Sequence, residues 1–140
     1  LAPAAAFSGG EQELSLSLNA AIVRSVTLVA PTSGIVIVTA SGWADFNGPD
    51  LDTVRCSITT GTSIDYAYSM LASDFGATSH QHQFAPFGMT RGYNVSAGSH
   101  TYNLVCNFEL ETSVVQIEDS NINAIFIPGA FSGSSMEGSP

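Results

Sequence analysis

The chain has 140 residues, 44% of them hydrophobic and 11% charged, so it can form one domain with a hydrophobic core but carries few charges for its length. Three arginines, no lysine and 12 acidic residues give a formal net charge of −9. Because such a surface repels phosphate groups, the composition argues against nucleic acid and anionic membranes as partners. No apolar run reaches the length of a membrane span.

Residues 1–19 are predicted to form an N-terminal arm or the first strand. A leader of small residues through Gly10 is expected to be flexible, and apolar and polar residues then alternate with the two-residue period of a β-strand. Such an arm could exchange with a neighbouring molecule, and its assembly contacts would come from Leu14, Leu16, Leu18 and Ile22. The simpler alternative is the first strand of the chain's own sandwich.

The start of the chain lacks Met and runs through small residues from Ala2 to Ala6. Such an N-terminus is typical of a secreted protein whose signal peptide has been removed, although an artificially chosen start of the chain would give the same sequence. We therefore expect a secreted, extracellular or cell-surface protein.

Short apolar segments separated by turns continue along the chain, and none needs a helix. A strand is predicted over Ile35–Phe46, with a weak point at Ser41–Gly42. Further strands are predicted over 22–28, 54–58, 64–71, 83–91, 101–108, 113–117 and 122–127, the last two separated by a turn at 119–121. This spacing predicts an all-β fold, an antiparallel β-sandwich or jelly roll of about eight to ten strands.

The strand within Gly92–Glu109 organises the prediction, because its apolar residues alternate with largely polar ones. One face should therefore point into the core and the other toward solvent. Cys106 lies on the inward phase, and so does Cys56 on its own strand. We expect a disulfide between them, which fits an oxidising compartment.

At residues 20–128 the sequence resembles a group of secreted bacterial β-sandwich proteins and is similar to the jelly roll of the C1q and tumour-necrosis-factor families. The resemblance rests on four segments: VTLVAPTSGIVIVTASGWADF, VRCSITTG, PFGMTRGYNVSAGSHTYNLVC and INAIFIP. Its motifs are a turn glycine and core alternation, so it implies a fold and no active site. Residues 129–140 lie outside it and read as a flexible Gly/Ser-rich C-terminal tail.

Two polar segments are candidates for metal binding. The loop DFNGPDLD offers oxygen ligands suited to calcium from Asp45, Asn47, Asp50 and Asp52, although an Asx-rich turn explains the same residues. His80 and His82 have a spacing that some metal sites use, although a solvated polar loop is the simpler interpretation. No cofactor is predicted, and calcium is the one ion with a candidate loop.

Asn94 begins an Asn-Val-Ser glycosylation sequon, whose use would require a glycosylating host. The sequence shows no G-x-S-x-G, H-E-x-x-H, P-loop or dinucleotide motif, so we expect a protein that is not an enzyme. An enzyme with an unrecognised site is the least favoured alternative.

Two functional hypotheses follow from these features. The first is a secreted structural subunit that self-assembles into an extracellular fibre or surface coat through its N-terminal strand. The second is a C1q/TNF-like oligomeric module that binds carbohydrate or cell-surface ligands. In the second, sugars would stack on Trp43, Tyr66, Tyr68 and Tyr93.

Overall fold

The computed structural model describes residues 4–48, 52–73, 82–109, 114–129 and 137–138. Most of these residues belong to strands, with one turn of 3-10 helix. The elements are β1 (Ala5–Ser15), β2 (Ala21–Ala30), β3 (Gly34–Asn47), β4 (Thr53–Thr59), η1 (Tyr66–Tyr68), β5 (Ser69–Ser73), β6 (Gln83–Val95), β7 (Gly98–Phe108), β8 (Val114–Pro128) and β9 (Glu137–Gly138).

The strands form a five-stranded sheet in the order β1-β8-β3-β6-β9 and a four-stranded sheet in the order β2-β7-β4-β5. The antiparallel pairs are nested, because β1 pairs with β8, β2 with β7, β3 with β6 and β4 with β5. The chain is therefore one long antiparallel ribbon rolled so that alternate pairs fall in opposite sheets. This is a jelly roll, and the prediction of an all-β antiparallel sandwich is confirmed.

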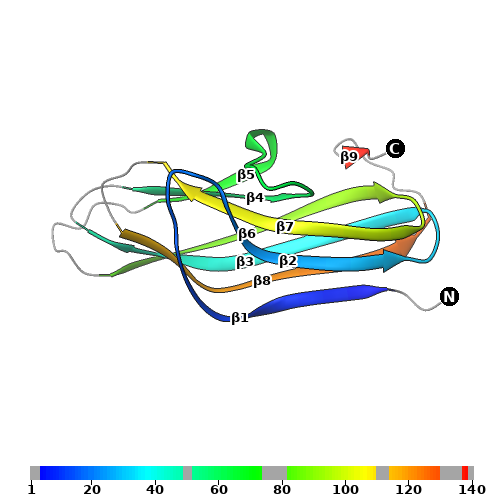
Figure 1. Ribbon diagram of the computed structural model, residues 1–140, viewed down its shortest axis with the longest axis horizontal. Coiled ribbons are helices and arrows are strands. Elements are labelled where there is room, and N and C mark those ends of the chain that lie inside the picture. Colours follow the sequence, from blue (N-terminus) through cyan, green and yellow to red (C-terminus); the bar gives the residue numbers. More distant parts are fainter. Residues whose placement is uncertain (1–3, 49–51, 74–81, 110–113, 130–136, 139–140) are drawn as a thin grey trace.

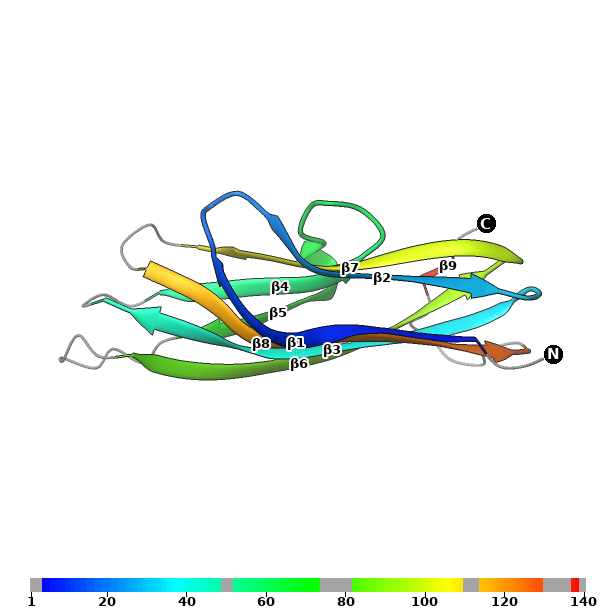
Figure 2. The same cartoon turned by 60° about the horizontal axis from the view of Figure 1, so that its bottom comes forward.

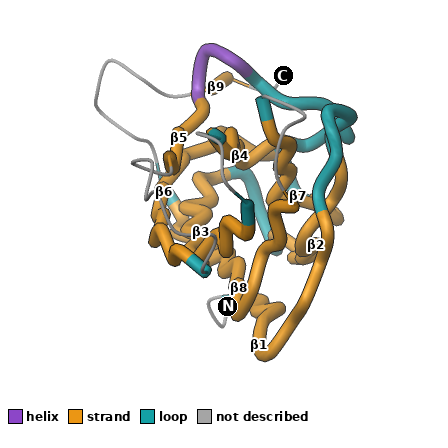
Figure 3. Tube along the Cα trace, turned by 90° about the vertical axis from the view of Figure 1, so that its left-hand side faces the viewer, coloured by secondary structure: helices purple, strands orange, loops and turns teal. Residues whose placement is uncertain are grey.

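The two sheets form two layers whose strands run along the length of the molecule (Figures 1 and 2). The view along the strands in Figure 3 shows the layers facing each other. Between them lie the largest fully buried apolar side chains, which include Phe46, Ile58, Tyr102, Leu104, Ile117 and Ile122. Each comes from the inward phase of its strand, as the two-residue period requires.

The N-terminal segment forms the first strand of the chain's own sandwich, as the simpler of the two predicted alternatives states, but it differs from the prediction in two details. Ala5 to Gly10 are not a flexible leader, because they pair with β8 of the same chain as the first half of β1. Gly9 makes this approach feasible, since a Cβ there would lie 2.7 Å from the Cβ of Asn121. The expected alternation also stops at Ser15, so the four proposed assembly residues do not share a face: Leu14 packs on the core, Leu16 is buried in it, and Leu18 and Ile22 are exposed.

The turn predicted at 119–121 is instead a bulge inside the continuous strand β8. Asp119 has a φ of 43°, and the registers of β8 with β1 and β3 shift at this level. The shift in β3 falls at the weak point predicted near Gly42. Ser120 beside the bulge accepts a hydrogen bond from Arg24 and donates one to Gln12, which connects β8, β2 and β1.

Two other segments also differ from the prediction. The strand expected from Ile64 begins with η1, because Asp65 caps this turn by accepting a hydrogen bond from the amide of Ala67. The tail is not wholly without regular structure, because its described residues 137–138 form β9, which pairs in parallel with β6.

The predicted disulfide between Cys56 and Cys106 is confirmed. The two residues are direct register partners on β4 and β7, and their Cα atoms are 4.2 Å apart. The bond therefore connects neighbouring strands of one sheet, with both sulfur atoms in the core.

Removing this disulfide with the Cys56→Ala/Cys106→Ala variant should lower the free energy of unfolding by about 4 kcal/mol. The reason is that the bond closes a loop with a sequence separation of 50 in the unfolded chain. Urea denaturation measures the change. A reducing agent should lower wild-type stability and leave the variant unaffected; equal stability of variant and oxidised wild type would contradict this role.

Candidate binding surfaces

The outer face of β7 is not solvated as the sequence analysis predicted. Every residue from Tyr102 to Phe108 is buried, including the outward-facing Asn103, Val105 and Asn107. Two loops cover this face, one formed by residues 16–20 and the other by residues 60–65. In Figure 2 both loops rise from the same side of the four-stranded sheet.

Hydrogen bonds from the two outward asparagines anchor these loops. Asn103 donates through Nδ2 to the carbonyl of Gly61 at 2.8 Å, and its Oδ1 accepts from the hydroxyl of Ser25 at 2.7 Å. Asn107 donates to the carbonyl of Leu18 at 3.1 Å, whereas its buried Oδ1 has no partner in the part of the chain that the structure describes. Both polar atoms of the Asn103 side chain are therefore hydrogen-bonded, whereas within the described residues only one of those of Asn107 is.

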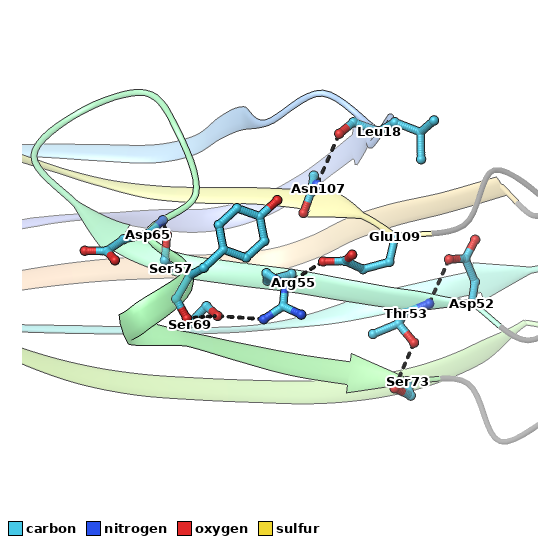
Figure 4. Close-up of polar contacts among 11 residues, drawn as sticks. Leu18, Asp52, Thr53, Arg55, Ser57, Asp65, Ser69, Ser73, Asn107 and Glu109 are labelled. Atoms are coloured by element: carbon cyan, nitrogen blue, oxygen red, sulfur yellow. Dashed lines mark hydrogen bonds and ion pairs between the residues drawn. The ribbon is translucent and has the colours of Figure 1, made fainter.

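Two arginines fix η1 after the 60–65 loop. Arg55 on β4 pairs with Glu109 and donates to the hydroxyl of Ser69 (Figure 4). It also lies 5.1 Å from the ring centroid of Tyr66. Arg91 on β6 pairs with Asp65 at 2.8 Å and lies 4.3 Å from the ring centroid of Tyr68. Each tyrosine is thus held by a cation–π contact.

Arg91 also connects the two sheets, because it donates to the carbonyl of Ile58 on β4 at 2.6 Å. The amide of Asp65 donates to the hydroxyl of Ser57, another β4 residue buried on the outer face. The turn that carries the tyrosines is therefore attached to the rigid part of the sandwich at several points.

The result is an exposed and ordered group of side chains at the β5 edge of the four-stranded sheet, which we name the tyrosine ridge. Its members are large side chains that follow one another through η1 and β5, namely Tyr66, Tyr68, Met70 and Leu71, with exposed fractions of 65%, 43%, 43% and 51%. A hollow of about 170 Å³ lies beside it, lined in part by Met89 and Arg91. Tyrosine, methionine and arginine are residue types enriched at binding interfaces.

The outer face of the five-stranded sheet has a different character. Val36, Val38 and Ala40 point into the core, so the residues between them on β3 face outward with their register partners. Three rows cross this face: Ala5-Ile125-Ile37-Gly92, Phe7-Asn123-Thr39-Thr90 and Gly9-Asn121-Ser41-Gly88. None of these twelve residues is charged, and we name them the charge-free face.

The polar side chains of the charge-free face bond to one another. Asn121 donates to the hydroxyl of Ser41 at 2.9 Å, and Asn123 donates to that of Thr39 at 3.4 Å. Beside them Phe7 and Ile125 are 66% and 51% exposed and line a shallow hollow of about 400 Å³. Covering this face would leave few polar groups without partners.

The predicted calcium ligands have separate contacts in the described residues. Asp45 is buried near the end of β3 and lies 2.7 Å from His82 Nδ1, while Asp52 accepts a hydrogen bond from the amide of Thr53. Asn47 is exposed at the end of β3, and Asp50 lies outside the described residues. In the described ranges no group of three or more His, Cys, Asp or Glu side chains is placed to hold a metal ion. Calcium binding stays a prediction.

The aromatic residues proposed to stack sugars are not brought together. Tyr66 and Tyr68 are exposed on the tyrosine ridge, Trp43 is exposed on the other sheet, and Tyr93 is 5% exposed and packs against the ring of Tyr102. Tyr93 is therefore unsuited to sugar stacking.

Two predicted site residues remain, the glycosylation candidate Asn94 and the metal-binding candidate His80. Asn94 is exposed on β6, and His80 lies outside the described residues. No helix in the described part of the chain is long and apolar enough to cross a membrane.

Sequence reasoning missed the exposure of Met70 and Leu71, the pairing of His82 with Asp45, and the fixing of η1 by Arg55 and Arg91. The sequence held one signal for the arginine contacts at η1. Three arginines stand against 12 acidic residues, so each arginine is expected to make a specific contact. Arg24 follows the same rule, because it donates to the carbonyl of Gly10 at 2.8 Å.

Comparisons with known proteins bear on the fold. No protein-family model matches the chain, and no curated protein matches its sequence. Eiger TNF from S. frugiperda aligns over 94% of this chain and 96% of its own, with 11% identity and a TM-score of 0.47. The dimeric latent form of PorU from Porphyromonas gingivalis aligns over 90% of this chain, with 14% identity and a TM-score of 0.51, and this chain spans 13% of its length. At these identities the similarity concerns the fold alone.

Proposed function

We propose that the chain is a non-enzymatic extracellular module that self-associates through the charge-free face and presents the tyrosine ridge to carbohydrate or cell-surface ligands. The observation that supports self-association most strongly is the composition of the charge-free face. A chain with 12 acidic residues keeps a three-row, four-strand area without any of them. The disulfide is compatible with an extracellular protein.

A second copy of the chain is the occupant that this face fits best. The core of a protein interface is depleted of charged residues, and exposed apolar patches on a single chain mark interaction sites. Two copies of a protein with a net charge of −9 repel each other, so contact is favoured where neither copy places a carboxylate. Phe7 and Ile125 would then be covered in the hollow between β1 and β8.

The tyrosine ridge lies on the opposite sheet and would remain accessible in such an oligomer. Tyrosines held in place before binding lose little conformational freedom when a ligand arrives, which favours affinity. Several copies in one oligomer would present several ridges, and weak single contacts would gain from multivalency. An oligomeric binding module of this kind is the second hypothesis of the sequence analysis, whereas the resemblance to C1q/TNF modules implies the fold alone.

The fibre hypothesis requires residues 1–19 to leave their own sandwich. In the described chain β1 pairs along β8 on both sides of its bulge, and Arg24 holds the carbonyls of Gly10 and Glu11. Exchange would break these contacts and re-form them in a neighbour. We therefore rank a closed oligomer above an exchanged filament.

Self-association is tested by sedimentation velocity. The wild type is expected to form a discrete oligomer, and the Phe7→Ser/Ile125→Ser variant to be monomeric with an unchanged circular dichroism spectrum. The control variant Val29→Ser/Leu71→Ser removes exposed apolar side chains from the other sheet and should keep the oligomer. A monomeric wild type at high micromolar concentration contradicts the proposal, and filaments in negative stain would favour the fibre.

Ligand binding is tested with labelled protein on a glycan array and on intact cells. The wild type is expected to bind, and the Tyr66→Ser/Tyr68→Ser variant to lose at least tenfold in affinity, because the loss of two central aromatic contacts typically costs more than about 1.4 kcal/mol. The Trp43→Ser control should retain this binding. A variant that binds as well as the wild type, or a wild type that binds neither glycans nor cells, would contradict the role of the ridge.

A further inference from the structure

We propose that the end of the five-stranded sheet around Trp43 binds an organic cation, an ammonium group that carries alkyl substituents. The residues are Trp43, Asp45, His82, Phe84 and Glu118, which we name the aromatic–carboxylate cluster. This site goes beyond the proposed function, since it involves neither the tyrosine ridge nor the charge-free face.

Three neighbouring strands place these residues together. Trp43 and Asp45 share the outward phase of β3, because Ala44 and Phe46 point into the core. Trp43 is the register partner of Glu118 on β8, and Asp45 is the register partner of Phe84 on β6. The cluster therefore lies where β3 ends and where β6 and β8 begin (Figure 1).

The cluster lies next to the charge-free face on the same sheet but contains none of its twelve residues. Trp43 lies two residues beyond Ser41 along β3. It lies four and six residues beyond Thr39 and Ile37, whose rows carry Phe7 and Ile125, or about 13 and 20 Å at roughly 3.3 Å per residue. The two tests use different residues and different readouts, sedimentation for Phe7 and Ile125 and fluorescence for Trp43, so the two proposals can fail independently.

Aromatic rings form the exposed part of the cluster. Trp43 and Phe84 are 44% and 55% exposed, and their ring centroids are 6.3 Å apart in an edge-to-face arrangement. The imidazole of His82 stacks on Phe84 with an interplanar angle of 13°. The rings thus hold one another in place while remaining open to solvent, and tryptophan is the aromatic residue that binds cations best.

A buried carboxylate lies beneath these rings. Asp45 is 2% exposed; its Oδ2 is 2.7 Å from His82 Nδ1, whereas its Oδ1 has no hydrogen-bond partner among the residues that the structure describes. A buried carboxylate oxygen without a partner is uncommon and favours the approach of a positive charge.

Further carboxylates surround the cluster. Loss of hydration raises the pKa of Glu118, and the carboxylates of Asp45, Glu13 and Asp119 raise it further, while His82 lowers it. Negative charge is thus crowded here. The chain has no lysine, and the arginine contacts seen among the described residues lie elsewhere: Arg24 at the bulge, and Arg55 and Arg91 beside η1. Within the described residues, His82 is the one basic side chain in the cluster, and it meets a single oxygen of Asp45, which leaves room for a cation from outside the chain.

The donor set favours an alkylated ammonium over a metal ion. Within the described residues no three His, Cys, Asp or Glu side chains are placed to hold a metal. Aromatic rings offer no ligand atoms to a bare ion, whereas they attract a cation whose apolar substituents make it weakly hydrated. Trimethylammonium groups combine these properties.

Fluorescence gives a direct test, because Trp43 is the only tryptophan of the chain. The protein is titrated with choline and, in parallel, with 3,3-dimethylbutan-1-ol, the neutral isostere in which carbon replaces the charged nitrogen. Choline should give a saturable change in Trp43 emission, and the neutral isostere should bind at least tenfold more weakly. Equal responses to both probes, no saturable response, or a response to calcium alone would each overturn the proposal.

Variants then assign the binding to the cluster. Glu118→Gln and Phe84→Leu should each weaken choline binding about fivefold or more, since each removes one attractive partner of the cation. Glu11→Gln is the matched control, because it removes the same charge from a residue that does not act on Glu118, and it should leave binding unchanged. Equal effects of Glu118→Gln and Glu11→Gln would overturn the assignment. Thermal denaturation of each variant verifies that it is folded.

Discussion

The burial of β7 on both faces is the constraint on which the rest of the structure depends. Its inner side chains fill the core, and Cys106 fixes β7 to β4 through the disulfide. Its outer asparagines need hydrogen-bond partners, because a buried amide without one costs about 1–3 kcal/mol. Asn103 and Asn107 obtain them from the backbone of the two covering loops. A strand buried in this way thus determines where residues 16–20 and 60–65 lie, and the second loop leads directly into the tyrosine ridge.

The two sheets use their outer faces differently because charge is scarce in this chain. Arg55 and Arg91 are both used to hold the turn over the four-stranded sheet. The five-stranded sheet receives no arginine on its outer rows, so its polar groups bond to one another in the charge-free rows, and carboxylates gather around Trp43 in the rows that follow. The same sandwich therefore presents three surfaces of different chemistry, namely the tyrosine ridge, the charge-free face and the aromatic–carboxylate cluster.

The sequence predicted the fold class and the disulfide, because a two-residue period and a matched inward phase are local signals that the tertiary structure preserves. It did not predict that Asp119 bulges rather than turns, since pairing on both sides of β8 overrides a local turn signal. Nor did it predict the cover over Val105, because an outward phase does not reveal what a distant loop will shield. The pairing of His82 with Asp45 joins residues 37 positions apart and depends on the β3–β6 register.

Hydrogen–deuterium exchange in the Asn103→Ala variant tests the central claim most directly. If Asn103 anchors the 60–65 loop, amide exchange across residues 60–68 should accelerate about tenfold, while the amides of β7 keep their wild-type protection. The Asn107→Ala variant should instead loosen residues 16–20 and leave 60–68 unchanged. Wild-type exchange rates across 60–68 in the Asn103→Ala variant would contradict the claim that β7 positions the tyrosine ridge.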